Sequence, residues 1–332
     1  MSGATRRVSV ALATFDGASY LEPQLRSILG QTRGVDELVI SDDGSSDGTL
    51  AIAERVLAGA AFEVRILRNP KPLGASRNFE VALQATTGDV IVLCDQDDVW
   101  HPHRVARALD VLTRPNAPLL VHADARRIDG DERVLPGGLL RALHVTAREY
   151  REIAAGRALR TLLRRNVVTG ATTAFRRELL DLAGPFPDAW IHDEWLGIVA
   201  AATGGIVLLR ESLVDYRQHD RNEIGAGDLT LAVRVGRLRS DRAARNARLL
   251  RRAEQFRDRV LALPVGVVAP GAVREAHGKV AHELARSRYP AARAHRLAPV
   301  LRELSTGRYS RYGRARFDVP RDLLQPAGES SP

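Results

Sequence analysis

The chain has 332 residues, 45% hydrophobic and 27% charged, which is enough for one large α/β domain and a further segment. A single cysteine, Cys94, excludes an internal disulfide and fits a reducing cytoplasm. No stretch approaches the roughly 18 uninterrupted apolar residues that predict a membrane-spanning helix, so we expect a cytoplasmic protein.

The net charge of +9 is unevenly distributed along the chain. Residues 226–332 hold 22 Lys and Arg against 10 Asp and Glu, a net of +12. Residues 1–225 hold 27 against 30, a net of −3. Such a basic region is typical of proteins that bind an anionic membrane surface, a phosphorylated acceptor or a nucleic acid.

The first 100 residues predict alternating strands and helices. Strands are expected in β-rich apolar runs at 7–13, 37–41, 62–67 and 89–94. Helices are expected where apolar residues recur with helical spacing, at 20–29, 49–57 and 75–85. This order implies an α/β fold with a Rossmann-like, doubly wound and mostly parallel sheet, whose ligands bind beyond the carboxyl ends of the strands.

The remaining chain shows a more mixed pattern. Two strands and a helix are expected, at 119–122, 206–209 and 193–202. Beyond residue 225 the chain reads as helical and basic, with a break at 264–271. We therefore expect two parts, an α/β domain over 1–225 and a basic, mainly helical region over 226–332.

The densest acidic cluster, Asp95, Asp97 and Asp98, directly follows an apolar strand. Three carboxylates repel one another, so burying them without a counter-charge is costly. Mg²⁺ or Mn²⁺ would remove that repulsion, and a metal held by few protein carboxylates commonly also binds substrate phosphates. A solvated acidic turn or a helix cap is the alternative, but the position after a buried strand favours a metal site.

Two further polar clusters fall at predicted strand ends, at 14–16 and 42–48. A carboxylate there, such as Asp42 or Asp43, can accept a hydrogen bond from a nucleobase or a ribose hydroxyl. Each cluster could instead be an ordinary turn with a helix cap, and Phe15 could belong to the core. The coincidence of three polar clusters with three strand ends supports a ligand site more strongly than any one of them.

The motifs, taken in order, resemble family 2 glycosyltransferases with the GT-A fold. The resemblance is carried, across residues 7–112, by VSVALATFDGASYLEPQLRSILGQT, ELVISDDGSSDGT, PLGASRNFEVAL and TTGDVIVLCDQDDVW. Weaker matches follow at 166–179, 190–201 and 213–225. The variant with DQDDVW, HDEW and YRQH most resembles the bacterial rhamnosyltransferase-like branch, whose members build O-antigens and other cell-surface polysaccharides.

The resemblance implies a role for each matching position. The positions at the donor nucleotide would be Phe15, Asp16, Asp42, Asp43, Arg77 and Asp95. The metal positions would be Asp95, Asp97 and His219, and the catalytic base would be Asp193. Asp16 stands where the family often has Asn, and Phe15 where it often has Tyr, and both substitutions keep the shape of the side chain.

The chemistry expected of these residues is an inverting, metal-dependent displacement. One carboxylate removes the proton of the acceptor hydroxyl while a cation neutralises the leaving nucleoside diphosphate. Glu194 competes with Asp193 for the part of base, because both open the same expected helix, and both could simply cap it. His219 could be a solvated loop residue rather than a ligand.

Three neighbouring residues have secondary expected roles. Asp98 extends the acidic pair, and His192 could bind the acceptor or shift the pKa of Asp193. Arg217 could pair with the diphosphate. The donor is expected to be a UDP-, dTDP- or GDP-linked sugar, rhamnose among the candidates, and the acceptor a hydroxyl of a cell-surface glycan or a lipid-linked molecule.

Two other classes of protein remain as alternatives. A nucleotidyltransferase acting on a sugar phosphate would share the sheet and the acidic ligands, but TFDGAS is a poor match to its Gly-rich loop. An inactive scaffold of this fold could bind nucleic acid or a membrane, but the metal and base positions hold competent residues. Nucleic acid is not expected, since Phe256 is the only aromatic residue among the arginines of 237–259. Peripheral attachment to the inner face of the plasma membrane explains the basic region equally well.

Overall fold

The computed structural model describes residues 6–219, 241–264 and 266–326. Within them, nine strands form one sheet, whose path runs β3-β2-β1-β4-β8-β6-β9-β5, with β7 paired to β6. The strands are β1 (Val8–Thr14), β2 (Glu37–Asp42), β3 (Glu63–Arg68), β4 (Val90–Asp95), β5 (Val99–Trp100), β6 (Leu120–Ile128), β7 (Val134–Gly138), β8 (Thr173–Arg176) and β9 (Ile206–Arg217).

Helices connect these strands and continue beyond them. Those up to β9 are α1 (Leu21–Leu29), α2 (Thr49–Leu57), α3 (Ala75–Ala85), α4 (Arg104–Leu112), α5 (Leu139–Ala142), α6 (Ala147–Ala154), α7 (Ala158–Leu162), α8 (Glu178–Ala183) and α9 (His192–Ala202), with a 3₁₀ turn η1 (Gly170–Thr172). Those in the C-terminal part are α11 (Arg242–Ala262), α12 (Ala272–Ser287), α13 (Leu297–Ser305), α14 (Arg308–Tyr312) and α15 (Ala315–Leu324), with a 3₁₀ turn η2 (Arg293–Arg296).

The first four strands are parallel, and they place their carboxyl ends at one edge of the sheet. β1 pairs with β2 on one side and β4 on the other, so that Thr14 lies opposite Asp42 and Ala13 opposite Asp95. The strands and helices expected in the first 100 residues are confirmed, α2 and α3 with the expected bounds. β8 then joins β4 in the antiparallel direction, which makes the complete sheet mixed.

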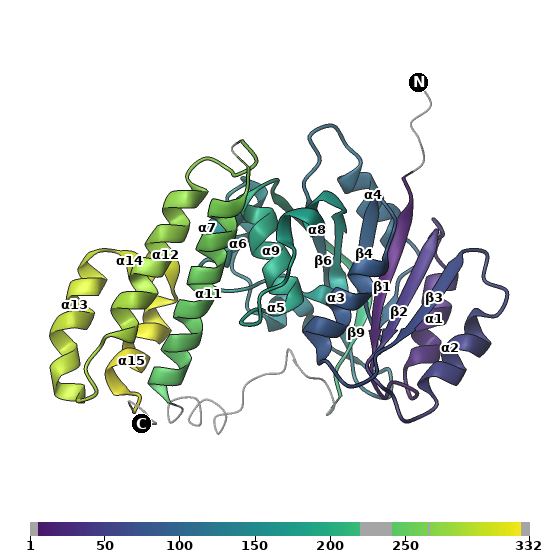
Figure 1. Cartoon of the computed structure of the whole chain (residues 1–332), viewed down its shortest axis with the longest axis horizontal. Helices are drawn as coiled ribbons and strands as arrows, with labels where there is room; N and C mark the ends of the chain where they lie inside the picture. Colours follow the sequence, from purple (N-terminus) through teal and green to yellow (C-terminus); the bar gives the residue numbers. More distant parts are fainter. Residues whose placement is uncertain (1–5, 220–240, 265, 327–332) are drawn as a thin grey trace.

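The sheet is covered by helices on both faces (Figure 1). Alternate residues of β1 point to opposite sides, since Val10 and Leu12 share a buried cluster with α1 and α4, whereas Ala11 belongs to the cluster that holds α3 and α9. Burial on both faces explains why the parallel strands read as continuous apolar runs. The layered core therefore holds the strand ends, and the loops that follow them, at fixed positions.

The C-terminal helices α11 and α12 lie beside α9, on the side of the domain away from β3 (Figure 1). Phe256 and Val260 of α11 belong to the buried cluster that also contains Trp195 of α9. The expected helix break is confirmed, because α11 ends at Ala262 and α12 begins at Ala272. The expected boundary between 225 and 226 lies outside the described residues, so the division into two parts stays a prediction.

None of the helices in the described ranges combines the length and the apolar character needed to cross a membrane.

Candidate active site

The acidic segment after β4 forms the centre of the candidate site. Asp98 is buried, and one of its oxygens accepts a hydrogen bond of 3.0 Å from the backbone N–H of Arg217. Its other oxygen has no hydrogen-bond partner among the described residues. Burial and the neighbouring charges of Asp97 and Asp95 raise the pKa of Asp98 well above its ordinary value. A buried, crowded carboxylate of this kind is stabilised by a cation.

The pKa values of Asp95 and Asp97 are raised as well. Burial raises the pKa of Asp95 to about 7, helped by the charges of Asp97 and Asp193. Burial also raises the pKa of Asp97, although His219 and Arg217 oppose that shift. Burial thus outweighs the nearby positive charges in setting the pKa values of these two carboxyl groups.

Arg104 supplies a positive charge that partly compensates this cluster. The buried guanidinium of Arg104, from the first turn of α4, donates to the backbone oxygen of Leu93 at 2.9 Å and lies 4.0 Å from the centre of the Trp100 ring. Its charge lowers the pKa of both Asp95 and Asp98. The single charge of Arg104 offsets only part of the repulsion among the carboxylates.

His219 is the last residue of the described range 6–219, and its side chain contacts the acidic cluster. Its Nε2 atom lies 2.9 Å from Oδ2 of Asp97, and its ring stacks on Tyr20 with 4.7 Å between centroids. Carboxylate oxygens and an imidazole nitrogen are suitable ligands for Mg²⁺ or Mn²⁺. No group of three His, Cys, Asp or Glu side chains in the described ranges is already arranged around a single metal position. A cation at Asp97 and His219 would therefore need further oxygens, which a substrate diphosphate can provide.

Arg217, the last residue of β9, supports the acidic segment. Its buried guanidinium donates to the backbone oxygen of Asp97 at 2.8 Å and to Glu132 at 3.0 Å, and it lies 4.9 Å from the centre of the Tyr20 ring. These contacts join the acidic segment to the turn that follows β6. In this arrangement Arg217 fixes the backbone of the acidic segment, and its pairing with a diphosphate stays a prediction.

Asp193 lies in the first turn of α9. Its carboxylate accepts hydrogen bonds from the backbone N–H groups of Gly170 at 2.8 Å and Glu194 at 2.6 Å. Burial nevertheless raises the pKa of Asp193 to about 6. Its charge also raises the pKa of Asp95. A carboxylate with a pKa near the working pH is well matched to the removal of a proton.

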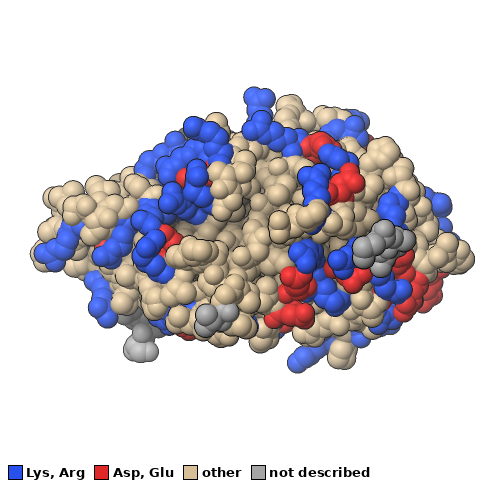
Figure 2. All heavy atoms as spheres, turned by 90° about the horizontal axis from the view of Figure 1, so that it is seen from above, with Lys and Arg blue, Asp and Glu red and all other residues tan. Residues whose placement is uncertain are grey.

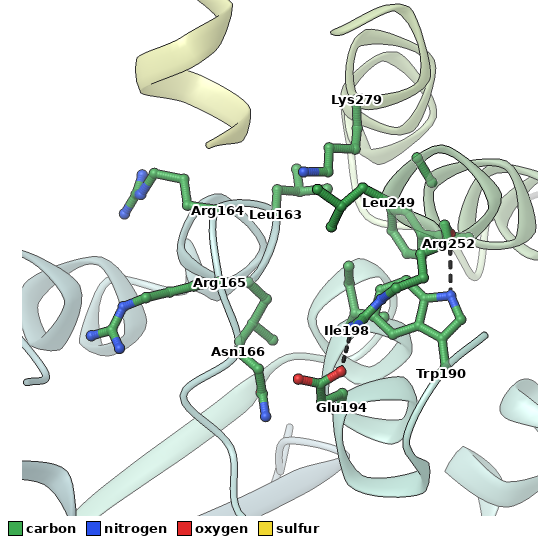
Figure 3. A pocket seen from close by; sticks show the side chains of 13 residues that line it. Leu163, Arg164, Arg165, Asn166, Trp190, Glu194, Ile198, Leu249, Arg252 and Lys279 are labelled. Atoms are coloured by element: carbon green, nitrogen blue, oxygen red, sulfur yellow. Dashed lines mark hydrogen bonds and ion pairs between the residues drawn. The ribbon is translucent and has the colours of Figure 1, made fainter. Parts of the chain in front are cut away.

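The neighbouring residue, Glu194, points to a different part of the molecule. It forms an ion pair with Arg252 of α11 and lines a cavity of about 200 Å³ between the sheet domain and the C-terminal helices (Figure 3). The indole N–H of Trp190 donates to the backbone oxygen of Arg252 at 3.1 Å, beside this pair. Successive residues of a helix point about 100° apart, which explains how Asp193 and Glu194 reach different surroundings.

His192 is buried and stacks on Phe79, with 4.0 Å between ring centroids. Burial lowers the pKa of His192 to about 3, so its imidazole is neutral at physiological pH. Neither ring nitrogen has a hydrogen-bond partner among the described residues. Gly170 packs closely here, since a Cβ atom in its place would lie 3.1 Å from Nε2 of His192.

Phe15 and Asp16 form the loop that follows β1. The ring of Phe15 is on the surface, with half of the residue exposed (50%), so it is not a core residue. Asp16 has a positive φ of 43°, a conformation that Asp and Asn tolerate better than most residues. Its carboxylate accepts from the backbone N–H of Ser46 at 2.8 Å, which ties this loop to the one after β2.

The two aspartates after β2 organise loops. Asp42 is buried and accepts from the hydroxyl of Thr14 at 3.0 Å and from the backbone N–H of Ser45 at 2.9 Å. Asp43 accepts from the backbone N–H groups of Leu73 and Gly74, each at 2.8 Å, and so holds the loop that leads into α3.

Arg77 lies in the first turn of α3. Its side chain is half exposed (51%) and forms an ion pair with Glu80. The residues expected at the nucleotide are thus on adjoining loops at one edge of the sheet, although their individual contacts with a donor remain predictions.

Residues 9–182 match the family described as Glycosyl transferase family 2, which is more than half of the chain. The chain belongs to glycosyl transferase family 2. It is therefore a glycosyltransferase, and its acidic cluster lies within the matched residues, whereas Asp193 follows them.

Two relatives support the assignment to glycosyl transferase family 2. An uncharacterized glycosyltransferase from Nostoc sp. is 28% identical over 220 residues, which cover 65% of this chain and 66% of that protein. The dTDP-rhamnosyl transferase RfbG from Shigella flexneri is 27% identical over 223 residues, covering 65% of this chain and 74% of RfbG. The match thus spans just under two thirds of the Nostoc protein.

Solved structures show that this family 2 member has the expected GT-A fold. S. aureus TarS in complex with UDP-GlcNAc superposes with a TM-score of 0.55 at 15% identity, covering 84% of this chain and 71% of TarS. The mannosyltransferase PcManGT from Pyrobaculum calidifontis, in complex with GDP-Man and Mn²⁺, superposes with a TM-score of 0.52 at 20% identity, covering 97% and 85%. The expected α/β architecture with a C-terminal helical region is confirmed.

Sequence reasoning missed several residues at this family 2 site. The side chain of Gln96 donates to the backbone oxygen of Phe15 and accepts from its N–H, both at 2.9 Å, and so clamps the loop after β1 to the end of β4. Burial and the charges of Asp98, Asp95, Asp97 and Asp193 all raise the pKa of Tyr216, on β9. The place of Gln96 between two aspartates was the available signal. None pointed to Tyr216 or to Arg104.

Proposed function

We propose that this glycosyltransferase transfers a sugar from a nucleoside-diphosphate sugar to an acceptor hydroxyl, with inversion at the anomeric carbon and with the help of a divalent cation. The observation that carries the proposal is the position of Asp193. It is a partly buried carboxylate with a raised pKa, electrostatically coupled to Asp95, while its neighbour Glu194 is engaged by Arg252. One carboxylate is thereby left for proton removal, next to a second acidic group suited to the donor.

In the proposed reaction, Asp193 accepts the proton of the acceptor hydroxyl. The hydroxyl oxygen forms a bond to the anomeric carbon as the bond from that carbon to the diphosphate oxygen breaks. The nucleoside diphosphate leaves with the bonding electron pair, and attack from the opposite side inverts the anomeric centre. A single displacement of this kind requires no covalent intermediate on the protein.

The residues that would hold the cation are Asp95, Asp97 and His219. Their fit is supported by the 2.9 Å contact between Asp97 and His219 and by the unpaired buried oxygen of Asp98 among the described residues. When bound, Mg²⁺ or Mn²⁺ would supply positive charge to the leaving diphosphate. The protein itself brings the carboxylates together at this site. Arg217 and Gln96 hold the surrounding backbone in place.

The donor nucleotide is proposed to lie over the loops after β1 and β2. The exposed ring of Phe15 would stack on the base, with Asp16 at the nucleotide, and Asp42 and Asp43 would order the surrounding loops. Arg77 would face the nucleotide from α3. A dTDP-linked deoxyhexose such as rhamnose is the proposed first donor, on the likeness to RfbG, with UDP- and GDP-linked sugars next.

The proposed acceptor is a hydroxyl of a cell-surface glycan or a lipid-linked molecule. This part rests on the resemblance to the rhamnosyltransferase-like branch. We also propose that residues 1–225 form the catalytic domain and residues 226–332 an appended helical region.

A thermal-shift panel tests the proposal directly. The full chain is heated with dTDP-rhamnose, UDP-GlcNAc or GDP-mannose, each with and without Mn²⁺, because a ligand selective for the folded state raises its melting temperature. We expect a shift with one donor class that needs Mn²⁺ and is lost in Asp97→Ala. Asp110→Ala, an exposed aspartate of α4, serves as the control and should keep the shift. A donor that binds equally well without metal would overturn the metal part of the proposal.

A further inference from the structure

Helix α13 presents an unpartnered row of leucines to solvent. Leu297, Leu301 and Leu304 recur at spacings of four and three, which places them on one face of the helix. They are 55%, 52% and 39% exposed, respectively. The fully buried Val300 borders this row on the inner side of the helix and packs with Tyr309 and Tyr289. These three residues are called the α13 leucine stripe below.

The segment around the stripe is strongly basic. Residues 288–326 contain nine arginines and only three acidic residues, namely Glu303, Asp318 and Asp322. The three acidic side chains point inward and are 6%, 15% and 0% exposed. The negative charge of the segment is therefore used in the interior, whereas most of its arginines, Arg296 excepted, stay outside.

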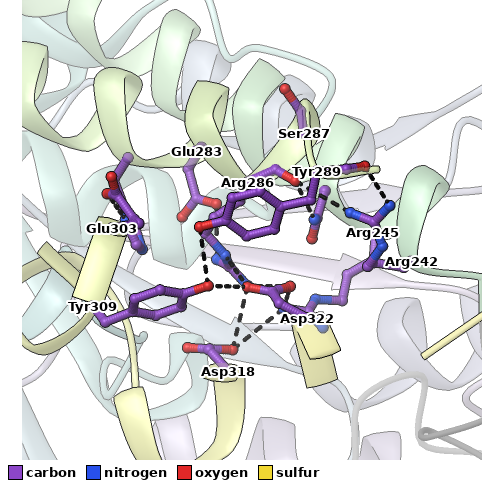
Figure 4. A network of polar contacts seen from close by, with 12 residues as sticks. Arg242, Arg245, Glu283, Arg286, Ser287, Tyr289, Glu303, Tyr309, Asp318 and Asp322 are labelled. Carbon is purple, nitrogen blue, oxygen red and sulfur yellow. Dashed lines mark hydrogen bonds and ion pairs between the residues drawn. The ribbon is translucent and has the colours of Figure 1, made fainter. Parts of the chain in front are cut away.

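An internal polar network accounts for this separation (Figure 4). Asp322 accepts from Arg286 Nε at 2.7 Å and from the hydroxyl of Tyr309 at 2.8 Å. Glu303 pairs with the buried His282 at 2.7 Å. These contacts hold the carboxylates inside the bundle of α12, α13, α14 and α15.

The arginines of the segment lie mainly at the surface. Arg302 is exposed and follows Leu301 directly, while Arg293, Arg314 and Arg316 are exposed before and after α13. Helix α13 forms the end of the molecule that lies farthest from β3 (Figure 1). In Figure 2, blue side chains predominate over the half that holds the C-terminal helices, while most red ones gather on the other half. Apolar and cationic side chains thus share an outermost, accessible surface.

We propose that the α13 leucine stripe, with Arg302 and the neighbouring arginines, docks the protein onto an anionic membrane surface. The leucines would enter the boundary between headgroups and acyl chains, and the arginines would bind lipid phosphates. A second copy of the chain fits this surface poorly, because two such faces would bring arginines against arginines. The inference is independent of the proposed reaction, since it concerns a different face and needs no turnover.

The α13 leucine stripe should make part of the membrane binding resistant to salt, which charge alone would not do. An attraction between arginines and anionic lipids is screened by salt, whereas burial of leucine side chains persists at high ionic strength. Binding to anionic vesicles should therefore weaken as salt is added but keep a remainder that depends on the leucines.

Vesicle cosedimentation of the full chain tests the proposal. The probes are vesicles of equimolar phosphatidylcholine and phosphatidylglycerol, and vesicles of phosphatidylcholine alone. We expect binding to the anionic vesicles only, weakened about tenfold by Leu301→Gln, since a leucine would no longer be buried in lipid. Leu261→Gln is the matched control, because Leu261 of α11 is 52% exposed as Leu301 is. For charge, Arg302→Gln is compared with Arg114→Gln, another exposed arginine.

Each outcome decides the proposal. Weaker binding of Leu301→Gln and Arg302→Gln, with both controls unchanged, supports it. It is overturned if the wild-type chain does not bind anionic vesicles at low ionic strength, or if Leu301→Gln binds as well as wild type. A dimer in light scattering that Leu301→Gln converts to a monomer, without vesicle binding, would assign the face to a second copy instead.

Discussion

The Nε2 atom of His219 lies 2.9 Å from the Oδ2 atom of Asp97, although 122 residues separate the two in the chain. The ring of Tyr20 stacks on His219 with an interplanar angle of 20°. The residue that caps α1, the acidic segment and the residues just after β9 thus hold one imidazole against one carboxylate. This relationship leads to the first prediction.

Replacing His219 by Ala should weaken Mn²⁺ binding in the presence of the donor nucleotide by about tenfold to a hundredfold, since it removes a proposed ligand. Isothermal calorimetry with Mn²⁺ and nucleoside diphosphate measures the effect. His103→Ala, on an exposed histidine before α4, is the control. Tyr20→Ala should cause a smaller loss of Mn²⁺ affinity. Tyr20→Phe should keep the wild-type affinity, because it keeps the stacked ring. Equal Mn²⁺ affinity in wild type and His219→Ala would remove His219 from the metal site.

Asp193→Asn should lower kcat by about a hundredfold to ten-thousandfold, the usual contribution of a general base, and leave donor affinity nearly unchanged. Glu194→Gln, on the next residue, should retain most of kcat because its partner is Arg252. Turnover with saturating donor, together with donor affinity from calorimetry, separates the two effects. If Glu194→Gln lost more turnover than Asp193→Asn, the two roles would have to be exchanged.

The pH dependence of folding offers an independent check on Asp193. Its folded pKa of about 6 lies above the ordinary value of 3.8, so the folded state holds this proton more tightly than the unfolded state. The stabilisation from the bound proton is complete below about pH 4 and is lost as the pH rises through about 6.

Relative to wild type, Asp193→Asn should therefore gain about 1–3 kcal/mol of unfolding free energy between pH 4 and pH 8. Urea denaturation across this range measures the change in the difference, which cancels any constant cost of the substitution. A difference that does not vary with pH would show that the carboxyl group of Asp193 titrates at its ordinary value.

Gln96→Ala should raise the KM for the donor by about tenfold with a smaller change in kcat, because the loop that carries Phe15 loses two hydrogen bonds. Gly17→Ala tests the same contact from the other side, since its added Cβ would lie 2.2 Å from the side-chain oxygen of Gln96. Gln84→Ala, on an exposed glutamine of α3, is the control. An unchanged KM in Gln96→Ala would show that the clamp does not position the donor loop.

Much of the local structure was predictable because short stretches of sequence carry it. The apolar run before Asp95 predicted both a buried strand and the point at which it ends. Helices α2 and α3 have the expected bounds because their apolar spacing is a local signal. The short strands β5 and β7 were not expected: β5 depends on pairing with the distant β9, and β7 pairs irregularly with the preceding β6.

In the candidate site, too, motifs predicted some features and tertiary packing decided others. The motif around Asp193 favoured it as the base and left its neighbour Glu194 as a competitor, since both open α9. Arg252 separates them by pairing with Glu194, and it lies on α11, 58 residues further along the chain. Arg217 likewise matched a motif near the diphosphate, whereas its buried guanidinium joins Asp97 to the turn after β6.

The sequence by itself determined the family, the order of strands and helices and the placing of acidic residues at strand ends, because local periodicity and ordered motifs encode these. Only the tertiary structure decided that His219 meets Asp97, that Glu194 turns away from the acidic cluster, and that α13 exposes leucines beside arginines. Such relationships arise when distant segments pack together, and side-chain direction, burial and charge compensation exist only after that packing.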